Sequence, residues 1–163
     1  MKHALHLSTL AEARQDLTHA LAWLQRSHEQ CTVLRPKQDL LAEDYDAFEA
    51  LTSRFARVSD ILLQKFFRAL DVVELSSGGT LLDVLLRAEK RGLVASADDF
   101  LEIRELRNEI SHEYAMDDLR ELFWDVLDKT PDLIKAVTTS LAYADNRYLA
   151  TKASVSNTED PNA

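Results

Sequence analysis

The chain contains few of the residues on which folds other than helical ones depend. It has one cysteine, Cys31, so no disulfide can form within it, which agrees with a reducing compartment. Only three glycines and three prolines occur among 163 residues, whereas sheets need turn residues every few positions. Because the remainder is rich in Leu, Ala, Glu, Asp and Arg, the composition predicts an all-α fold.

Long apolar runs are also missing. No stretch approaches the roughly 18 uncharged apolar residues of a membrane span. The first residues lack the apolar block and the small-residue cleavage site of a secretion signal. We therefore expect a soluble cytoplasmic protein with no membrane partner.

The net charge of −9 argues against a nucleic-acid partner, because phosphate binding requires cations. The middle third, residues 51–107, is locally neutral, with nine Lys or Arg against nine Asp or Glu. On a helical wheel Arg54, Arg57, Lys65 and Arg68 fall within about 80° of one another. This basic stripe is either a track for RNA or a solvated face with intrahelical ion pairs.

Apolar periodicity and the positions of the helix-breaking residues predict one helical domain over residues 1–151. Its form is an up-down bundle of four main helices plus short extra ones. Breaks are expected at Pro36, at Gly78-Gly79, at Gly92 and at Pro131, where Thr130 would cap a new helix. The predicted helices are 8–31, 44–75, 80–91, 96–114, 117–127 and 130–148. The polar tail, residues 152–163, is predicted to be disordered.

The fourth predicted helix has three distinct faces. Ile103, Leu106 and Ile110 form its buried stripe, and Glu102, Glu105, Glu109 and Glu113 form an acidic solvated face. Arg104, Asn108 and His112 follow one another at i, i+4 spacing, with Arg107 and Ser111 in the adjacent row. Arg107 and His112 are about 140° apart on a straight helix. A second copy of the motif would therefore help to complete a site.

The segment Arg107-Asn108-x-x-x-His112-x-Tyr114 resembles the signature of the HEPN superfamily, and is most similar to that of the HepT toxins. In these toxins the arginine is followed after four residues by histidine, and after one more by tyrosine. The layout of the preceding helices is also similar, so that the resemblance covers about residues 44–146. Only the eight-residue motif is specific.

This resemblance implies a homodimer of helical bundles in which the two motifs face each other across a cleft. It implies metal-independent cleavage of RNA, with no cofactor, and a minimal nucleotidyltransferase antitoxin as partner. Such an antitoxin transfers AMP to the motif tyrosine, which corresponds to Tyr114 here.

The motif residues suit the chemistry of RNA cleavage, in which the ribose 2′-hydroxyl attacks the adjacent phosphate. His112 is the predicted acid–base group, because histidine exchanges protons near neutral pH. Arg107 stays charged and offers a planar fork to phosphate oxygens. We expect Asn108 and Tyr114 to support the site, with Arg104 and Ser111 as further RNA-binding candidates.

Two other functions remain open. The chain is alternatively a non-catalytic, substrate-binding or regulatory subunit of a nucleotidyltransferase, or the antidote member of its pair. No metal site is predicted, since His3 and His6 lack a cysteine or carboxylate framework. Trp23 and Trp124 are expected in the core or in a dimer interface.

Overall fold

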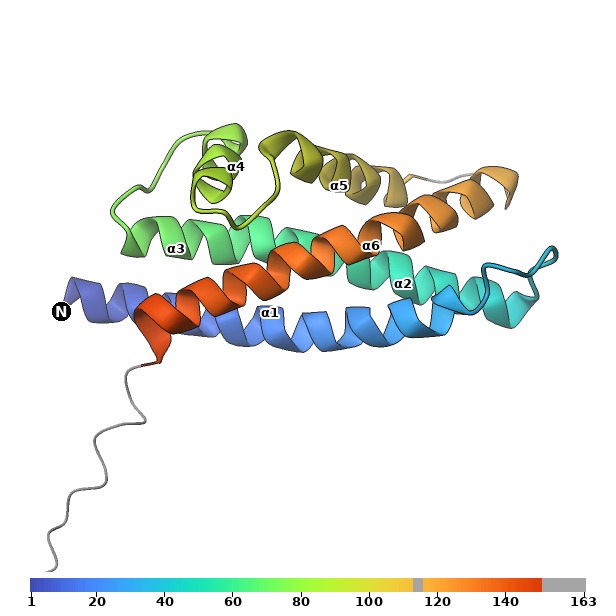
Figure 1. The fold of residues 1–163 in the computed structure, drawn as a ribbon, viewed down its shortest axis with the longest axis horizontal. Helices are drawn as coiled ribbons and strands as arrows, with labels where there is room; N and C mark the ends of the chain where they lie inside the picture. Colours follow the sequence, from blue (N-terminus) through green and yellow to red (C-terminus); the bar gives the residue numbers. More distant parts are fainter. Residues whose placement is uncertain (113–115, 151–163) are drawn as a thin grey trace, which may run out of the picture.

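The computed structural model describes residues 1–112 and 116–150, and within these ranges the chain is helical, with no strand (Figure 1). The prediction of an all-α fold is confirmed for this part of the chain. The elements are α1 (Lys2–Thr32), α2 (Ala42–Asp60), the π-helix η1 (Ile61–Phe66), α3 (Phe67–Val73), α4 (Leu81–Lys90), α5 (Ala97–Ile110), α6 (Met116–Ala144) and the π-helix η2 (Asp145–Leu149).

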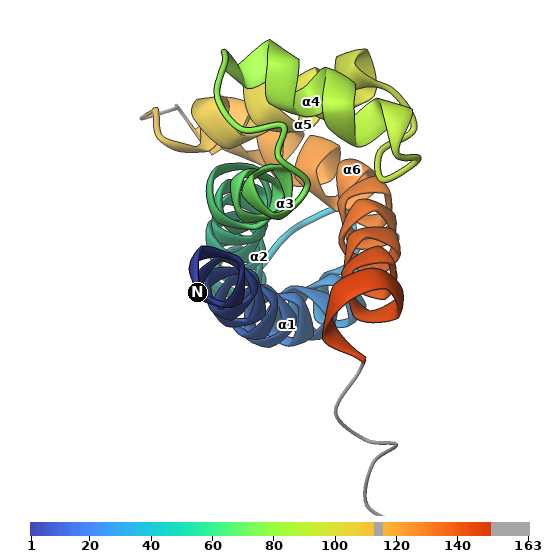
Figure 2. The ribbon, with the colours of Figure 1, turned by 90° about the vertical axis from the view of Figure 1, so that its left-hand side faces the viewer.

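Three long rods form the body of the molecule. The first is α1, the second is the continuous run α2–η1–α3 antiparallel to it, and the third is α6, which contacts both (Figure 1). Seen end-on, α4 and α5 lie as a second layer on the side of the rods away from α1 (Figure 2). Helix α5 packs on α2 and α6, so the first residues of the predicted motif, 107–110, lie in this upper layer.

The core is dominated by aromatic rings. All six phenylalanines of the chain are fully buried, and none of them comes from α1, which contributes leucines instead. Phe48 stacks on Phe123 with ring centroids 5.1 Å apart, and Trp124 meets Phe48 edge-on at 5.0 Å. These contacts join α2 to α6. They also confirm that Trp124 packs against the core, whereas Trp23 is 55 % exposed and lies outside it.

A buried polar network fastens α4 and the end of the described chain to α3. Asp71, whose side chain is 2 % exposed, accepts hydrogen bonds from Arg87 (3.0 and 2.8 Å) and Arg91 (2.6 Å). Arg91 also donates to Glu74 (2.6 Å), whose other oxygen accepts from the hydroxyls of two tyrosines, Tyr143 (2.7 Å) and Tyr148 (2.8 Å). One carboxylate at the end of α3 thus connects α4, α6 and η2.

Burial and hydrogen bonding shift the pKa values in this network. Burial opposes the charged form of Glu74, but the two tyrosine hydroxyls and the Arg91 guanidinium outweigh it and hold the pKa of Glu74 below its ordinary value. Burial, together with the hydrogen bond to Glu74, raises the pKa of Tyr148 to about 12. The network is therefore most stable with Glu74 charged and Tyr148 protonated.

One helix end agrees with expectation and another differs. Gly92 has φ +77° and closes α4, as predicted, with Leu93 N donating to Ala88 O (3.0 Å). The α2–η1–α3 rod ends in the same way, but the left-handed residue is Leu75, with φ +58°, and not one of the nearby glycines. Ser76 N donates to Asp71 O (2.8 Å) across this turn.

The prediction of separate helices over 117–127 and 130–148 is wrong, because α6 runs unbroken through Pro131. The Thr130 hydroxyl donates to Val126 O (2.7 Å), and Leu127 and Leu133 are buried on either side of the proline. Their burial holds the helix together despite the missing N–H. None of the helices in the described part of the chain is both long and apolar enough to cross a membrane. The predicted tail, 152–163, lies outside the described residues.

Candidate functional site

Helix α5 begins and faces the core as its sequence predicts. The Ser96 side chain caps it by accepting a hydrogen bond from Asp99 N (3.0 Å). Phe100 and Ile103 are buried, and Leu106 and Ile110 are half-buried against the same core. The predicted acidic residues Glu102, Glu105 and Glu109 are exposed, while Glu113 lies outside the described residues. The helix therefore presents a polar face that includes Arg107.

Arg107 is held by Asp60, the last residue of α2. Its Nε donates to Oδ1 and its Nη2 to Oδ2 of Asp60, both at 2.8 Å, and the side chains are 32 % and 46 % exposed. The hydrogen bonds to Asp60 raise the pKa of Arg107 further above its already high value. This parallel pair uses two of the five guanidinium N–H groups and leaves the Nη1 edge for another ligand.

A π-helix starts at the residue that follows Asp60. Residues of η1 bond five positions apart, and such turns are rare and occur frequently at functional sites. The turn changes the direction of the side chains after residue 60 relative to those before it. Asp60 is therefore the last residue in α-helical register with the first half of the rod.

The helix that carries the motif ends earlier than predicted. It stops at Ile110, and Ser111 is its C-cap, with Ser111 Oγ donating to Asn108 O at 2.6 Å. His112 N donates to Glu109 O (3.0 Å) in the following turn. The predicted row therefore ends at Asn108, and the 140° angle between Arg107 and His112 no longer applies because His112 is not in the helix. Ser111 and His112 are absent from α5 because the Ser111 hydroxyl and backbone amide both satisfy Asn108 O.

Most of the other motif residues are exposed, and one lies outside the residues that the structure describes. Asn108, Ser111 and His112 are exposed at the C-terminal end of α5 or just beyond it, and Arg104 is half-buried in the middle of the helix. Tyr114 lies outside the described residues, so its predicted return to the side of Arg107 is not part of this geometry. The structure brings Arg107 together with Asp60, a residue that no local pattern in the sequence singles out.

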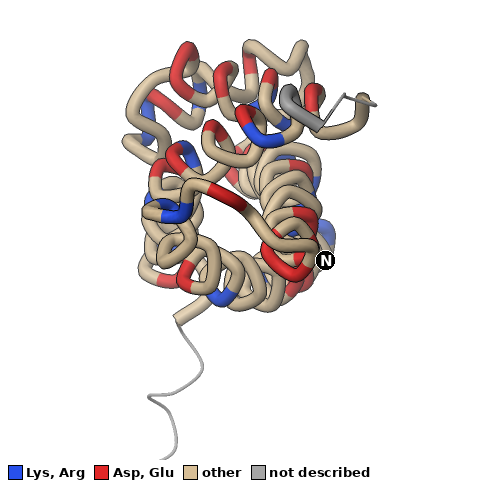
Figure 3. Tube along the Cα trace, turned by 90° about the vertical axis from the view of Figure 1, so that its right-hand side faces the viewer, with Lys and Arg blue, Asp and Glu red and all other residues tan. Residues whose placement is uncertain are grey.

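The four residues of the predicted basic stripe have different surroundings and do not share one set of contacts. Arg54 donates to Ser27 Oγ (2.6 Å) and its guanidinium lies 4.8 Å from the centre of the Trp23 indole. Lys65 pairs with Asp16 at 3.6 Å and Arg68 donates to a neighbouring glutamine, while Arg57 is exposed. Because η1 lies between the two halves, one helical wheel does not relate them. Along the backbone trace of Figure 3, positions of Lys and Arg are intermixed with those of Asp and Glu and do not form one continuous track.

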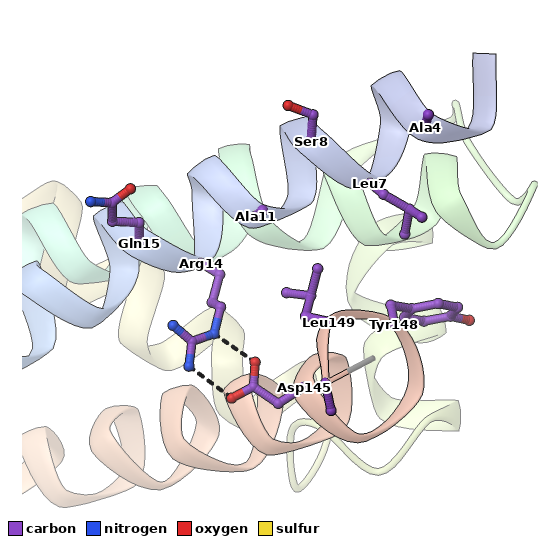
Figure 4. A pocket seen from close by; sticks show the side chains of 10 residues that line it. Ala4, Leu7, Ser8, Ala11, Arg14, Gln15, Asp145, Tyr148 and Leu149 are labelled. Carbon is purple, nitrogen blue, oxygen red and sulfur yellow. Dashed lines mark hydrogen bonds and ion pairs between the residues drawn. The ribbon is translucent and has the colours of Figure 1, made fainter. Parts of the chain in front are cut away.

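A wide groove lies away from the motif. It measures about 1150 Å³ and runs between the first half of α1 and η2 (Figure 4). Arg14 and Asp145 form a parallel ion pair across it, at 2.6 and 2.9 Å. In Figure 1 the first turns of α1 and the end of the described chain, which line this groove, are near the left end of the molecule, and the end of α5 is to the right of them.

Metal ligands do not cluster in the part of the chain that the structure describes, where no group of three or more His, Cys, Asp or Glu is placed to share an ion. Cys31 is buried and its Sγ donates to Ala47 O (3.4 Å). Burial raises the pKa of this thiol to about 11, which makes it a poor nucleophile. The candidate site therefore consists of Arg107, Asp60 and the exposed turn after Ile110. The chain matches none of the protein-family models, curated proteins or solved structures with which it was compared.

Proposed function

We propose that this chain is a metal-independent endoribonuclease that acts as a homodimer of up-down helical bundles. The observation that carries the proposal is the orientation of Arg107 by Asp60 in the last turn of α5, which an exposed turn with His112 follows in the chain. The resemblance of the segment 107–114 to the HepT motif supports it. An RNA substrate agrees with the predicted cytoplasmic location.

Arg107 provides the phosphate-binding group in this proposal. Asp60 occupies the Nε and Nη2 side of the guanidinium, so the Nη1 edge is directed to its ligand without a further loss of side-chain freedom. Charge that develops on the non-bridging phosphate oxygens is then stabilised by a group already in position. Asp60 acts as a positioning residue.

His112 moves the protons. It removes the proton of the ribose 2′-hydroxyl, whose oxygen then bonds to phosphorus. The bond from phosphorus to the 5′-oxygen breaks, and that oxygen receives a proton. The products are a 2′,3′-cyclic phosphate and a 5′-hydroxyl, and no water or metal is consumed. One step needs a base and the other an acid, so His112 from each of two protomers would fill the two roles.

Asn108, Ser111 and Arg104 would line the same surface and contact the sugar or phosphate of the RNA. A minimal nucleotidyltransferase is the proposed antitoxin, and transfer of AMP to Tyr114 would block the site. This modification places a phosphate and a nucleoside beside Arg107 and His112, where they would exclude RNA.

The test is cleavage of RNA by the purified full-length chain in EDTA. We expect His112→Ala and Arg107→Ala to lose activity by about 100-fold or more. His3→Ala is the matched control, since His3 is exposed in the first turn of α1. Products should end in a 2′,3′-cyclic phosphate. Equal cleavage by the wild type and His112→Ala would contradict the proposal.

The second candidate is a non-catalytic subunit of a nucleotidyltransferase, and the Arg107–Asp60 pair also favours it. An arginine that only braces α5 against α2 would make the same two hydrogen bonds. Expression in cells separates the two functions. Growth arrest that His112→Ala relieves supports the ribonuclease, and harmless expression supports the binding subunit.

A further inference from the structure

Trp23 is an exposed aromatic residue in an acidic protein. Its side chain is on α1 with 55 % of the residue exposed, although tryptophan is usually mostly buried. One face of the indole lies against the Arg54 guanidinium at 4.8 Å. Arg54 also donates to Ser27 Oγ (2.6 Å), so both the ring and the cation are held in place.

The surroundings of Trp23 are locally cationic. Trp23, Arg54, Arg57 and Ala20 border an open hollow of about 190 Å³ between α1 and α2. Along α1, the residues one turn from Trp23 include His19 and Arg26 and no carboxylate. This patch therefore differs from most of a chain whose net charge is −9.

The patch shares helix α2 with the proposed catalytic surface. Arg57 lies one turn before Asp60 on α2, and Asp60 holds Arg107. Arg54 and Asp60 are about 9 Å apart along the helix axis and about 120° apart around it, with the exposed Arg57 between them. The only carboxylate on this path is Asp60, and its charge is offset by Arg107.

We propose that Trp23, Arg54 and Arg57 form a stacking subsite for an unpaired base of the RNA that this protein cleaves. Stacking on an indole needs only one open ring face, which an exposed tryptophan backed by arginine provides, while an enclosed pocket is not required. Arg57 contacts the adjacent phosphate. This inference rests on the proposed ribonuclease function and assigns it single-stranded RNA as substrate.

The test is binding of a short 2′-O-methyl oligouridine, which cannot be cleaved because its 2′-oxygen is blocked. We expect Trp23→Ala to raise Kd by about tenfold or more and Trp23→Phe, which keeps a ring, to raise it by less than about threefold. Arg57→Ala should weaken binding and reduce its salt dependence. The oligonucleotide should quench the tryptophan fluorescence of the wild type and not that of Trp23→Phe.

Leu86→Ala and Lys90→Ala are the controls, since both residues are exposed on α4. They should leave Kd unchanged. An unchanged Kd in Trp23→Ala overturns the subsite, as does a change from dimer to monomer in that variant by analytical ultracentrifugation, which would place Trp23 in a protein interface. If the oligonucleotide binds through Trp23 but unmodified RNA is not cleaved, the proposed ribonuclease function is contradicted and the proposed base-stacking subsite is supported.

Discussion

Arg107 and Asp60 are 47 residues apart in the sequence and joined by two parallel hydrogen bonds of 2.8 Å. Arg14 and Asp145 have the same geometry between α1 and η2, with similar exposure. Partly exposed pairs of this kind contribute at most about 1 kcal/mol. The chain therefore contains two arginine–aspartate pairs that are alike as contacts and differ in position.

Arg107→Ala and Arg14→Ala should lower the free energy of unfolding by similar amounts, each at most about 1 kcal/mol. Only Arg107→Ala should lower RNA cleavage, by about 100-fold or more, because Arg107 belongs to the proposed catalytic motif and Arg14 does not. Urea denaturation and an RNA cleavage assay on the same preparations measure both effects. Loss of cleavage in both variants would indicate a general effect on the fold and contradict the assignment of Arg107.

Asp71→Asn should destabilise the protein strongly. Asp71 accepts from Arg87 and Arg91, and the Arg91 side chain is only 10 % exposed. Breaking a buried ion pair costs up to about 3–5 kcal/mol, and because Arg91 keeps its pair with Glu74 the loss here should fall at the lower end of that range. Asp145→Asn, in an exposed pair, should cost at most about 1 kcal/mol. Equal losses in urea unfolding would show that the buried network does not behave as one unit.

Tyr148→Phe should change how stability depends on alkaline pH. The pKa of Tyr148 is about 12 in the folded protein, above the ordinary value of 10.0. A group with a raised pKa stabilises the fold fully below its unfolded pKa, and this contribution is lost as pH rises through the folded pKa. The wild type should therefore lose stability between about pH 10 and about pH 12 more steeply than Tyr148→Phe.

Glu74→Gln is the companion variant, because the Glu74 carboxylate helps to raise the pKa of Tyr148. It should flatten the same alkaline range. The pKa of Glu74 is itself lowered, so its contribution is present above the ordinary carboxyl range and lost as pH falls through the folded pKa. The variant should thus also be less sensitive to acid. Unfolding midpoints in urea across both ranges provide the measurement.

Pro131→Ala should stabilise the protein by about 1 kcal/mol or more. Pro131 is exposed inside α6, and alanine would restore an N–H able to donate to Leu127 O. If a helix instead began at this proline, the substitution would remove a favourable first residue and destabilise the fold. The sign of the change in unfolding free energy, measured by circular dichroism, separates these cases.

Local patterns predict those parts of the fold that depend on neighbouring residues. Gly92 ends α4 and Ser96 caps α5 because these roles need only the residue's own conformation or a nearby amide. The local pattern at Pro131 wrongly predicts a helix break, because the burial of Leu127 and Leu133 outweighs the lost hydrogen bond. That burial depends on packing between helices, which a local pattern does not contain.

The candidate site was predictable only in part for the same reason. The motif singles out Arg107 and His112, but a helical wheel assumes that the helix continues, and α5 ends at Ile110. Asp60 gave no signal, since an acid 47 residues away becomes a partner only when α5 packs on α2. The π-turn after it has no sequence signature that we recognise.

The π-helix η1 gives the second rod one more residue than a plain α-helix of the same length would hold. In evolutionary terms the turn has the form of a single-residue insertion that the helix absorbed without breaking. Deleting one residue there should restore plain α-helical hydrogen bonding and leave Phe66 and Phe67, which are both fully buried, on the core side of the rod. Asp60 is the residue immediately before this π-helix. The first half of the rod, which ends at Asp60, can therefore change in sequence without altering the register of the second half, which contains Asp71.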